Sequence, residues 1–203
     1  MHPPLFCFET ICVQQRRFGN LLPYHEARLN RTRSALWGIS EPIHLAELLV
    51  VPDQVGHEKY KCRITYGARI ETVEWEKYQP RSIQSLRLVE DNAIDYGFKY
   101  KNRDALNALH AQRGDSDDVL IVKNGLVTDT SYANVAFFDG SAWCTPAKPL
   151  LPGTQRAFLL DEGVVISKEI RADDLVKYRA VKLFNAMVGW EEAHELLVDS
   201  LRN

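Results

Sequence analysis

This sequence has few cysteines, no long apolar run and little net charge. The four cysteines form no C-x-x-C pair and the six histidines are scattered, so the ligand spacing of a zinc site is absent. No apolar run reaches membrane-spanning length, and residues 1–4 do not begin a secretory signal. The 25 basic residues are balanced by 27 acidic ones, which leaves no electrostatic footprint for nucleic acid. We therefore expect a cytoplasmic protein without a metal, a nucleic-acid partner or a membrane contact.

The pattern of β-branched, aromatic and turn residues predicts a mixed α/β fold (α+β) in two lobes. Pro80 marks a break in the pattern. We expect a small N-terminal α/β lobe over residues 1–80 and a larger C-terminal α/β lobe, carrying Lys99, over residues 81–203. The elements expected in the first lobe are strands at 5–13, 18–22, 60–66 and 68–78, with a turn at Gly19-Asn20, and helices at 23–37 and 44–49.

Antiparallel hairpins, rather than repeated βαβ units, are predicted to connect the strands of the second lobe. Asn124-Gly125 is a strong signal for a two-residue hairpin, and Asp139-Gly140 is a second turn signal. The elements expected there are strands at 86–90, 119–122, 126–128, 134–138, 164–169 and 180–184, and helices at 102–112, 154–162 and 172–178.

Lys99 is the first residue whose setting indicates chemistry. It stands between Phe98 and Tyr100, just before a predicted helix. A lysine held against apolar surface loses hydration, and its amine becomes a better nucleophile. A lysine that lies across aromatic rings with its charge in water is the commoner arrangement. This segment by itself leaves both interpretations open.

Asp129 and residues 151–156, Leu-Pro-Gly-Thr-Gln-Arg, indicate a second group of contacts. A carboxylate at a strand end can pair with a protonated ring nitrogen and make a pyridine ring a better electron sink. Free N–H groups at the start of a helix suit a phosphate. The alternatives are an aspartate that bonds its own turn and an ordinary N-cap at Thr154.

Several other positions are candidates for ligand contacts. Arg28, one helical turn after Tyr24, could hold a phosphate dianion by paired hydrogen bonds if it points inward, whereas a surface arginine would be solvated. Asn185-Ala186 follows a predicted strand, where small residues let the backbone approach a ligand, or where the strand simply ends. Arg63 and Arg69 are candidates for binding substrate carboxylates, although arginines in strands are usually exposed.

The order of these segments resembles that of a known family. The segments are Phe8-Glu9-Thr10, His25-x-x-Arg28-Leu29, Gly97-Phe98-Lys99, Val127-Thr128-Asp129 through Asn134, Thr145-Pro146 with residues 151–156, and Phe184-Asn185-Ala186-Met187. In this order they resemble the class IV aminotransferases, the fold-type IV pyridoxal phosphate enzymes. That family includes branched-chain and D-amino-acid aminotransferases and aminodeoxychorismate lyase.

The resemblance implies a two-lobed fold-type IV fold, pyridoxal 5′-phosphate as the cofactor and a homodimer. It implies that Lys99 is the catalytic residue and forms the Schiff base. Two positions depart from the family pattern: Asp129 stands where a glutamate is usual, and Thr154 lies one place earlier than the threonine of the G-I-T-R motif. The cofactor-binding residues that the resemblance implies are Arg28, Lys99, Asp129, Asn134, Thr154, Gln155 and Ala186.

Lys99-x-x-Asn102-Arg103 and Asn185-Ala186 are similar to the lyase branch in particular. We therefore expect a 4-amino-4-deoxychorismate lyase that acts on a small amino-bearing carboxylate and gives 4-aminobenzoate, a folate precursor, and pyruvate. The alternatives are an amino-acid aminotransferase of the branched-chain or D-amino-acid type and a non-catalytic relative that binds a phosphorylated ligand or a partner protein. A nucleotide-binding domain would need a glycine-rich phosphate motif, which the sequence lacks.

Overall fold

The structure, a computed structural model, describes residues 5–202; residues 1–4, interpreted above as lacking a secretory signal, lie outside the described residues. The chain forms two units. The first runs to Gln79 and also includes Phe98–Asn102, and the second comprises Pro80–Gly97 and the chain from Arg103 onward. Lys99 therefore belongs to the first unit, not to the C-terminal lobe as expected. The reason is strand-like pairing, because the Phe8 N–H donates to the Lys99 carbonyl at 2.9 Å.

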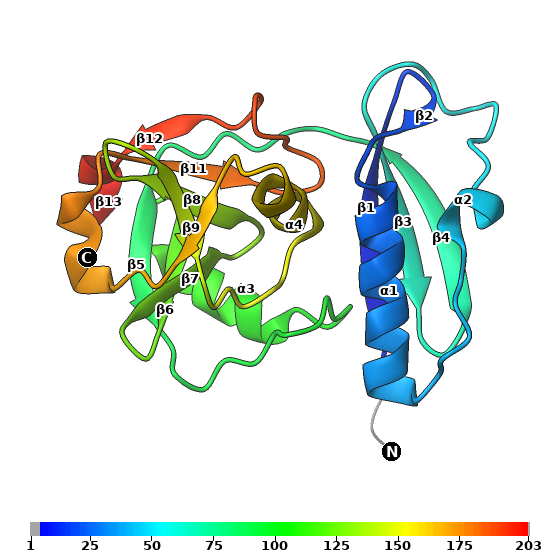
Figure 1. Cartoon of the computed structure of the whole chain (residues 1–203), viewed down its shortest axis with the longest axis horizontal. Helices are drawn as coiled ribbons and strands as arrows, with labels where there is room; N and C mark the ends of the chain where they lie inside the picture. Colours follow the sequence, from blue (N-terminus) through cyan, green and yellow to red (C-terminus); the bar gives the residue numbers. More distant parts are fainter. Residues whose placement is uncertain (1–4, 203) are drawn as a thin grey trace. The chain divides into compact units, whose positions relative to one another are not determined.

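The first unit is an antiparallel sheet with a long helix on one face (Figure 1). Strand order is β2-β1-β3-β4, and the helix α1 packs on the face that carries Ile11, Cys62 and Ile64. Pro23 lies in the first turn of α1, and Gly38 ends the helix with a φ of 68°. The bounds are β1 (Cys7–Gln14), β2 (Arg17–Phe18), α1 (Leu22–Trp37), α2 (Leu45–Leu48), β3 (Tyr60–Tyr66) and β4 (Ile70–Lys77).

The turn between β1 and β2 differs from the prediction. Gln15 and Arg16 form it with φ values of 52° and 58°, whereas Gly19-Asn20 was the expected turn. Left-handed backbone is costly for residues other than glycine. The Arg16 guanidinium offsets this cost, because it donates to the carbonyls of Asp53 at 3.0 Å and Val55 at 2.5 Å. A contact with residues almost forty positions away in the chain thus decides the turn.

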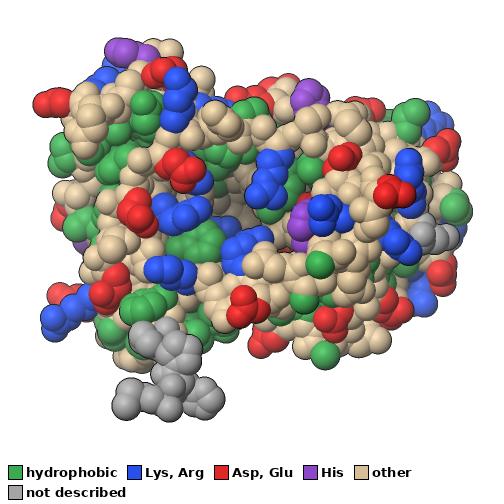
Figure 2. Space-filling view, turned by 180° about the vertical axis from the view of Figure 1, so that it is seen from behind, with side chains coloured by type: hydrophobic (Ala, Val, Ile, Leu, Met, Phe, Trp, Pro, Cys, Tyr) green, Lys and Arg blue, Asp and Glu red, His purple; other side chains and the backbone are tan. Residues whose placement is uncertain are grey.

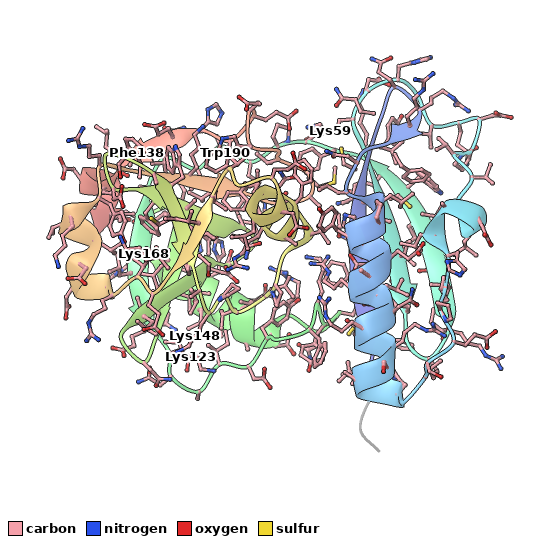
Figure 3. All side chains as sticks on the ribbon, viewed as in Figure 1. Lys59, Lys123, Phe138, Lys148, Lys168 and Trp190 are labelled. Atoms are coloured by element: carbon pink, nitrogen blue, oxygen red, sulfur yellow. The ribbon has the colours of Figure 1, made fainter. Side chains whose placement is uncertain are left out.

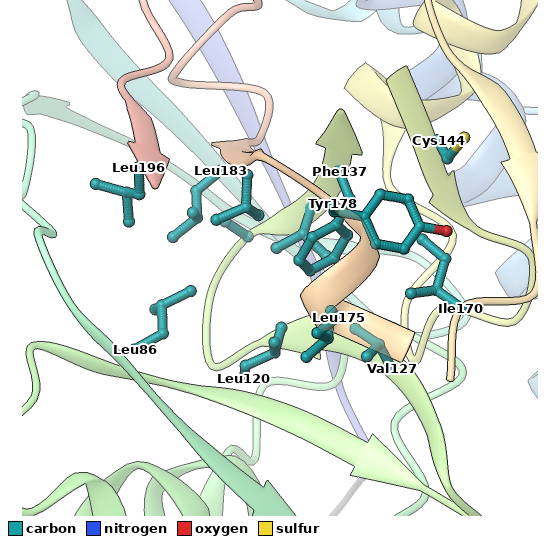
Figure 4. Packing of buried hydrophobic residues seen from close by; sticks show 13 residues of the cluster. Leu86, Leu120, Val127, Phe137, Cys144, Ile170, Leu175, Tyr178, Leu183 and Leu196 are labelled. Atoms are coloured by element: carbon teal, nitrogen blue, oxygen red, sulfur yellow. The ribbon is translucent and has the colours of Figure 1, made fainter. Parts of the chain in front are cut away.

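The second unit contains two sheets, in the orders β13-β5-β6-β7 and β10-β9-β8-β11-β12. Figure 4 shows the core between them, where Leu86 and Leu120 of one sheet meet Phe137 and Leu183 of the other. Most pairs are antiparallel, but β5 pairs in parallel with β6 and β13, and β9 with β10. The bounds are β5 (Leu86–Glu90), α3 (Asp104–His110), β6 (Asp118–Lys123), β7 (Leu126–Thr130), β8 (Asn134–Phe138), β9 (Trp143–Pro146), α4 (Thr154–Asp161), β10 (Ile166–Lys168), β11 (Ala180–Phe184), β12 (Glu195–Leu197) and β13 (Leu201–Arg202).

Helix α4 packs on the outer face of the five-stranded sheet. Its Leu159 is buried with Phe184 of β11 and Ala136 of β8. Beside them lies an aromatic cluster that includes Phe138 and Trp190, labelled in Figure 3. This packing sets the direction of α4 and therefore the place of its first residues, which matter for the site below.

Two expected helices are short in the structure, and three elements near the end of the chain were not predicted. Residues 111–113 and 172–177 form 3₁₀ turns, and β12, β13 and the 3₁₀ turn Val198–Ser200 had no clear sequence signal. Strands of three and two residues are too short for a period-two pattern to be read. Within residues 5–202, no helix is long and apolar enough to cross a membrane, and no group of three or more metal-ligating side chains occurs.

The mixture of charges on the surface and the free cysteines match what the composition predicts. In Figure 2, Lys and Arg side chains alternate with Asp and Glu side chains over the visible face. All four cysteines are free. Cys7, Cys62 and Cys144 are buried as expected, whereas Cys12 is only half-buried.

Candidate active site

Lys99 lies against an aromatic surface within the first unit. Its Nζ atom is 4.9 Å from the centroid of the Phe8 ring, and its own side chain is half-buried. Phe98 and Tyr100, its neighbours in the chain, contact each other edge to face with ring centroids 5.9 Å apart. The amine is therefore held beside apolar surface, which is the setting that the nucleophile interpretation requires.

Arg63 shares the Phe8 ring with Lys99. Its Cζ atom lies 5.6 Å from the same ring centroid, because Arg63 on β3 pairs with Thr10 on β1 and both face the side of the sheet that carries Phe8. Within the described residues Arg63 makes no hydrogen bond or ion pair, whereas Lys61 on the same strand pairs with Glu76. Glu74 lies opposite Arg63 on β4. Lys61 and, to a smaller extent, Arg63 lower the pKa of Glu76, but no ion pair among the described residues holds the exposed Arg63 guanidinium, which is therefore available to a carboxylate ligand. Arg69 is also exposed, in the turn after β3.

Arg28 is buried and already paired. Its Nε donates to Oε1 of Glu9 at 2.9 Å and its Nη2 to Oε2 at 2.5 Å, a two-bond arrangement. Nδ1 of His25 lies 2.6 Å from Oε2 of the same carboxylate. Burial raises the pKa of Glu9, but Arg28 and His25 outweigh it and bring that pKa down to about 2. Arg28 thus points inward, which is the arrangement that phosphate binding requires, but Glu9 and His25 were not identified from the sequence as its partners.

Side-chain and backbone N–H donors hold Asp129 inside the second unit. The Asn134 side chain donates to Oδ1 at 2.7 Å, and the Leu151 backbone N–H donates to Oδ2 at 2.8 Å. Burial raises the pKa of Asp129 to about 6, although these donors, the charge of Arg156 and the Leu150 backbone N–H pull it down. A buried carboxylate of this kind gains from a cationic partner such as a protonated ring nitrogen.

The start of α4 lies beside this carboxylate. Thr154 and Gln155 are buried in its first turn, and a Cβ atom on Gly153 would collide with the side chain of Asn134. Arg156 donates from Nη2 to the Pro146 carbonyl at 2.8 Å, but its buried Nε has no partner within the described residues. An orphaned buried donor at the first turn of a helix fits an anionic ligand. The sequence signal for this segment did not single out Arg156.

Ala186 follows β11 near the same region. Phe184 at the end of β11 pairs with Asn134, and Asn185 folds the next turn by accepting the Met187 N–H at 2.8 Å. The structure therefore brings together Asp129, Asn134, residues 153–156 and Ala186 in the second unit. Within the first unit it places Lys99 and Arg63 at one ring and Arg28 with Glu9.

Comparison with known proteins decides the family. The family described as "Amino-transferase class IV" matches residues 6–196. The chain belongs to this family. An uncharacterized protein of Haemophilus influenzae is 36% identical over 184 residues, which cover 90% of this chain and 97% of that protein. The expectation of a class IV aminotransferase, and with it of an enzyme, is confirmed.

Solved structures agree with this assignment. A crystal structure from Haemophilus somnus 129pt, provisionally named a 4-amino-4-deoxychorismate lyase, has a TM-score of 0.83 and 31% identity and covers 93% of this chain and 100% of that one. A hypothetical aminotransferase from Mycobacterium tuberculosis in its PLP-bound form has a TM-score of 0.76 and 20% identity and covers 97% of this chain and 81% of that one. The mixed α/β fold of fold-type IV enzymes is thus confirmed.

Proposed function

We propose that this protein is a pyridoxal phosphate-dependent lyase that converts 4-amino-4-deoxychorismate into 4-aminobenzoate and pyruvate. The observation that carries the proposal is the contact of both Lys99 and Arg63 with the Phe8 ring, which places an amine and an exposed guanidinium at one side chain. The substrate carries an amine and two carboxylates. The likeness to the Haemophilus somnus protein over its whole length supports this reaction.

Pyridoxal phosphate is the cofactor that the family and the residues indicate. When bound, it supplies an aldehyde that condenses with amines and a pyridine ring that accepts electrons. The chain has a suitable group for each part of it. Lys99 suits the aldehyde, and the buried carboxylate of Asp129 suits the protonated ring nitrogen. The first turn of α4, with the orphaned Nε of Arg156, suits the phosphate, as does the buried Arg28.

The chain's own residues then have distinct tasks. The Lys99 amine would hold the cofactor and would accept the proton from the amine-bearing carbon of the substrate. Asp129, held in place by Asn134, would keep a proton on the ring nitrogen. Arg63 holds a substrate carboxylate. Loss of that proton and departure of the enolpyruvyl group from the adjacent carbon leave an aromatic ring, and the released enolpyruvate takes up a proton to give pyruvate.

The second candidate function is an amino-acid aminotransferase. The Mycobacterium tuberculosis structure favours it, because a protein named as an aminotransferase has this fold. The same Lys99, Asp129 and Arg63 would serve that reaction, since they act before the two paths diverge. A non-catalytic binder is the remaining alternative. Such a protein would have no need of a lysine held beside an aromatic ring.

The deciding experiment uses purified protein saturated with pyridoxal phosphate and incubated with 4-amino-4-deoxychorismate. We expect equal amounts of 4-aminobenzoate and pyruvate from the wild type. Lys99→Ala should give neither product, whereas Lys101→Ala, which changes the neighbouring lysine over the Phe6 ring, should remain active. Amino-group transfer to 2-oxoglutarate or pyruvate without lyase products would favour the aminotransferase. A colourless protein in which borohydride attaches no cofactor to Lys99 would favour the non-catalytic binder.

We also propose that the protein acts as a homodimer in the cytoplasm. The support is the family resemblance, because its members place their sites near a subunit interface. Light scattering at micromolar concentration should give twice the 23.2 kDa mass of the chain. A single-chain mass in the presence of the cofactor would contradict the proposal.

A further inference from the structure

Glu9 is a charged residue in a place where charge is costly. It lies on β1 and is completely buried, in line with Cys7 and Ile11 on the face that α1 covers. His25 of α1 is also completely buried, and Arg28 is 6% exposed. Isolated charges are not stable in such an interior unless they are paired and hydrogen-bonded. The buried Glu9 therefore depends on its contacts with His25 and Arg28.

The contacts restrict Arg28 to one orientation. Two parallel bonds from Nε and Nη2 to the two oxygens of Glu9 fix the plane of the guanidinium. His25 reaches Oε2 at 2.6 Å from the preceding turn of the helix, so the carboxylate itself cannot turn. Thr32 adds a bond of 2.8 Å from its hydroxyl to the Arg28 carbonyl, which pins the same stretch of α1.

Strand β1 links this set to the cofactor lysine. Successive side chains on a strand point to opposite faces, so Phe8 and Glu9 lie on opposite sides of the sheet. Phe8 contacts the Lys99 amine, and its backbone N–H donates to the Lys99 carbonyl at 2.9 Å. The charge of Lys99 is also close enough to lower the pKa of His25, although burial is the larger cause. Arg28 and Lys99 are thus positioned by adjacent residues of one strand.

We propose that Glu9 is a positioning residue that orients the Arg28 guanidinium toward the cofactor phosphate, with His25 holding the carboxylate in place. The inference rests on the proposed function, because it takes Arg28 as a phosphate ligand. Since Glu9 neutralises the charge of Arg28, the guanidinium binds the phosphate through the direction of its N–H groups rather than through long-range attraction. Loss of Glu9 should then affect the phosphate contact specifically.

The test compares pyridoxal phosphate with pyridoxal, which lacks the phosphate. For each variant, the dissociation constants of both compounds are measured by the absorbance of the imine at Lys99, and their ratio reports the phosphate contact. We expect Glu9→Gln to reduce the preference for pyridoxal phosphate by about tenfold, as loss of an outer-shell partner does at metal ligands. Glu71→Gln, an exposed carboxylate of the same unit, is the matched control and should leave the ratio unchanged.

A double variant tells whether Glu9 acts through Arg28. Arg28→Met should reduce the same preference, and adding Glu9→Gln to it should reduce the preference no further. Should Glu9→Gln not fold, as judged by thermal unfolding, Glu9→Asp keeps the charge but is too short for both bonds, and it should reduce the preference several-fold.

The outcomes separate this inference from the proposed function. A folded Glu9 variant that loses affinity equally for both compounds, or that keeps the wild-type ratio, would show that the ion pair is only structural. Additive losses in the double variant would also overturn the inference. A wild type that forms no imine with either compound would instead refute the proposed function.

Discussion

Asn134 donates its side-chain amide to Oδ1 of Asp129 over 2.7 Å, and both side chains are buried. The same amide also donates to the Leu151 carbonyl at 3.0 Å, while the Leu151 N–H donates back to Asp129. The three residues form a closed set of hydrogen bonds that holds the carboxylate in one position. A carboxylate has about four lone-pair sites, so it can still accept from a ring nitrogen.

Asn134→Ala should weaken catalysis without unfolding the protein. The change removes one of the donors that lower the pKa of Asp129, so that pKa should rise and the carboxylate should be protonated over a wider pH range. We expect kcat/KM to fall about tenfold at pH 7 and the acid limb of its pH profile to move to higher pH. Asn107→Ala, on the exposed surface of α3, is the control. A lowered rate with an unmoved profile would contradict this role.

Gly153→Ala tests the close approach between Gly153 and Asn134. Its new Cβ atom would overlap the Asn134 side chain, so the start of α4 or the Asp129 contact must shift. We expect a loss of about 1–3 kcal/mol in the free energy of unfolding and weaker binding of pyridoxal phosphate. Gly19→Ala, where no atom lies within 4 Å of the added Cβ, should change neither property. Chemical denaturation and cofactor titration measure both.

The raised pKa of Asp129 makes the protein less stable as the pH rises. Its pKa is 3.8 in a model peptide and about 6 in the fold, so the folded state binds more protons between these values. Relative to Asp129→Asn, the wild type without cofactor should lose about 2 kcal/mol of unfolding free energy between pH 4 and pH 7. Urea denaturation of both proteins at the two pH values measures this difference. Parallel pH dependences would refute it.

Glu9 has the opposite dependence. Its pKa falls from 4.5 to about 2 in the fold, so its contribution is complete above pH 4.5 and is lost as the pH falls toward 2. Between pH 6 and pH 3 the wild type should lose about 2 kcal/mol of unfolding free energy relative to Glu9→Gln. Urea denaturation midpoints of the two proteins that stay the same distance apart across this range would disprove the prediction.

Arg63→Ala should weaken substrate binding more than Arg69→Ala does. Arg63 lies over the same ring as Lys99 and forms no ion pair within the described residues, whereas Arg69 lies in the turn after β3. A charged hydrogen bond is worth about 1.5–3 kcal/mol, so KM should rise roughly ten- to a hundredfold. Steady-state kinetics of the lyase reaction measures KM for both variants. Equal effects of the two substitutions would remove Arg63 from the site.

Local signals predicted much of the secondary structure correctly. Pro23 and Gly38 bound the helix α1, and Asn124-Gly125 forms the turn between β6 and β7 with φ values of 53° and 72°. These features depend on the backbone preferences of single residues, which can be recognised directly in the sequence. The turn at Gln15 and Arg16 was not predicted, because carbonyls distant in the chain stabilise it. The segment of Lys99 was assigned to the wrong lobe for a similar reason, since its partner is β1.

The sequence by itself determined the family, because the order of Arg28, Lys99, Asp129 and residues 151–156 is a property of the chain. The tertiary structure alone decided the partners of these residues. Glu9 meets Arg28 across 19 positions, and Leu151 meets Asp129 across 22. Burial shifts the pKa of Asp129 upward, and the ion pair shifts that of Glu9 downward. Desolvation and pairing depend on which segments surround a side chain, and that is set by packing of the folded chain rather than by its neighbours in sequence.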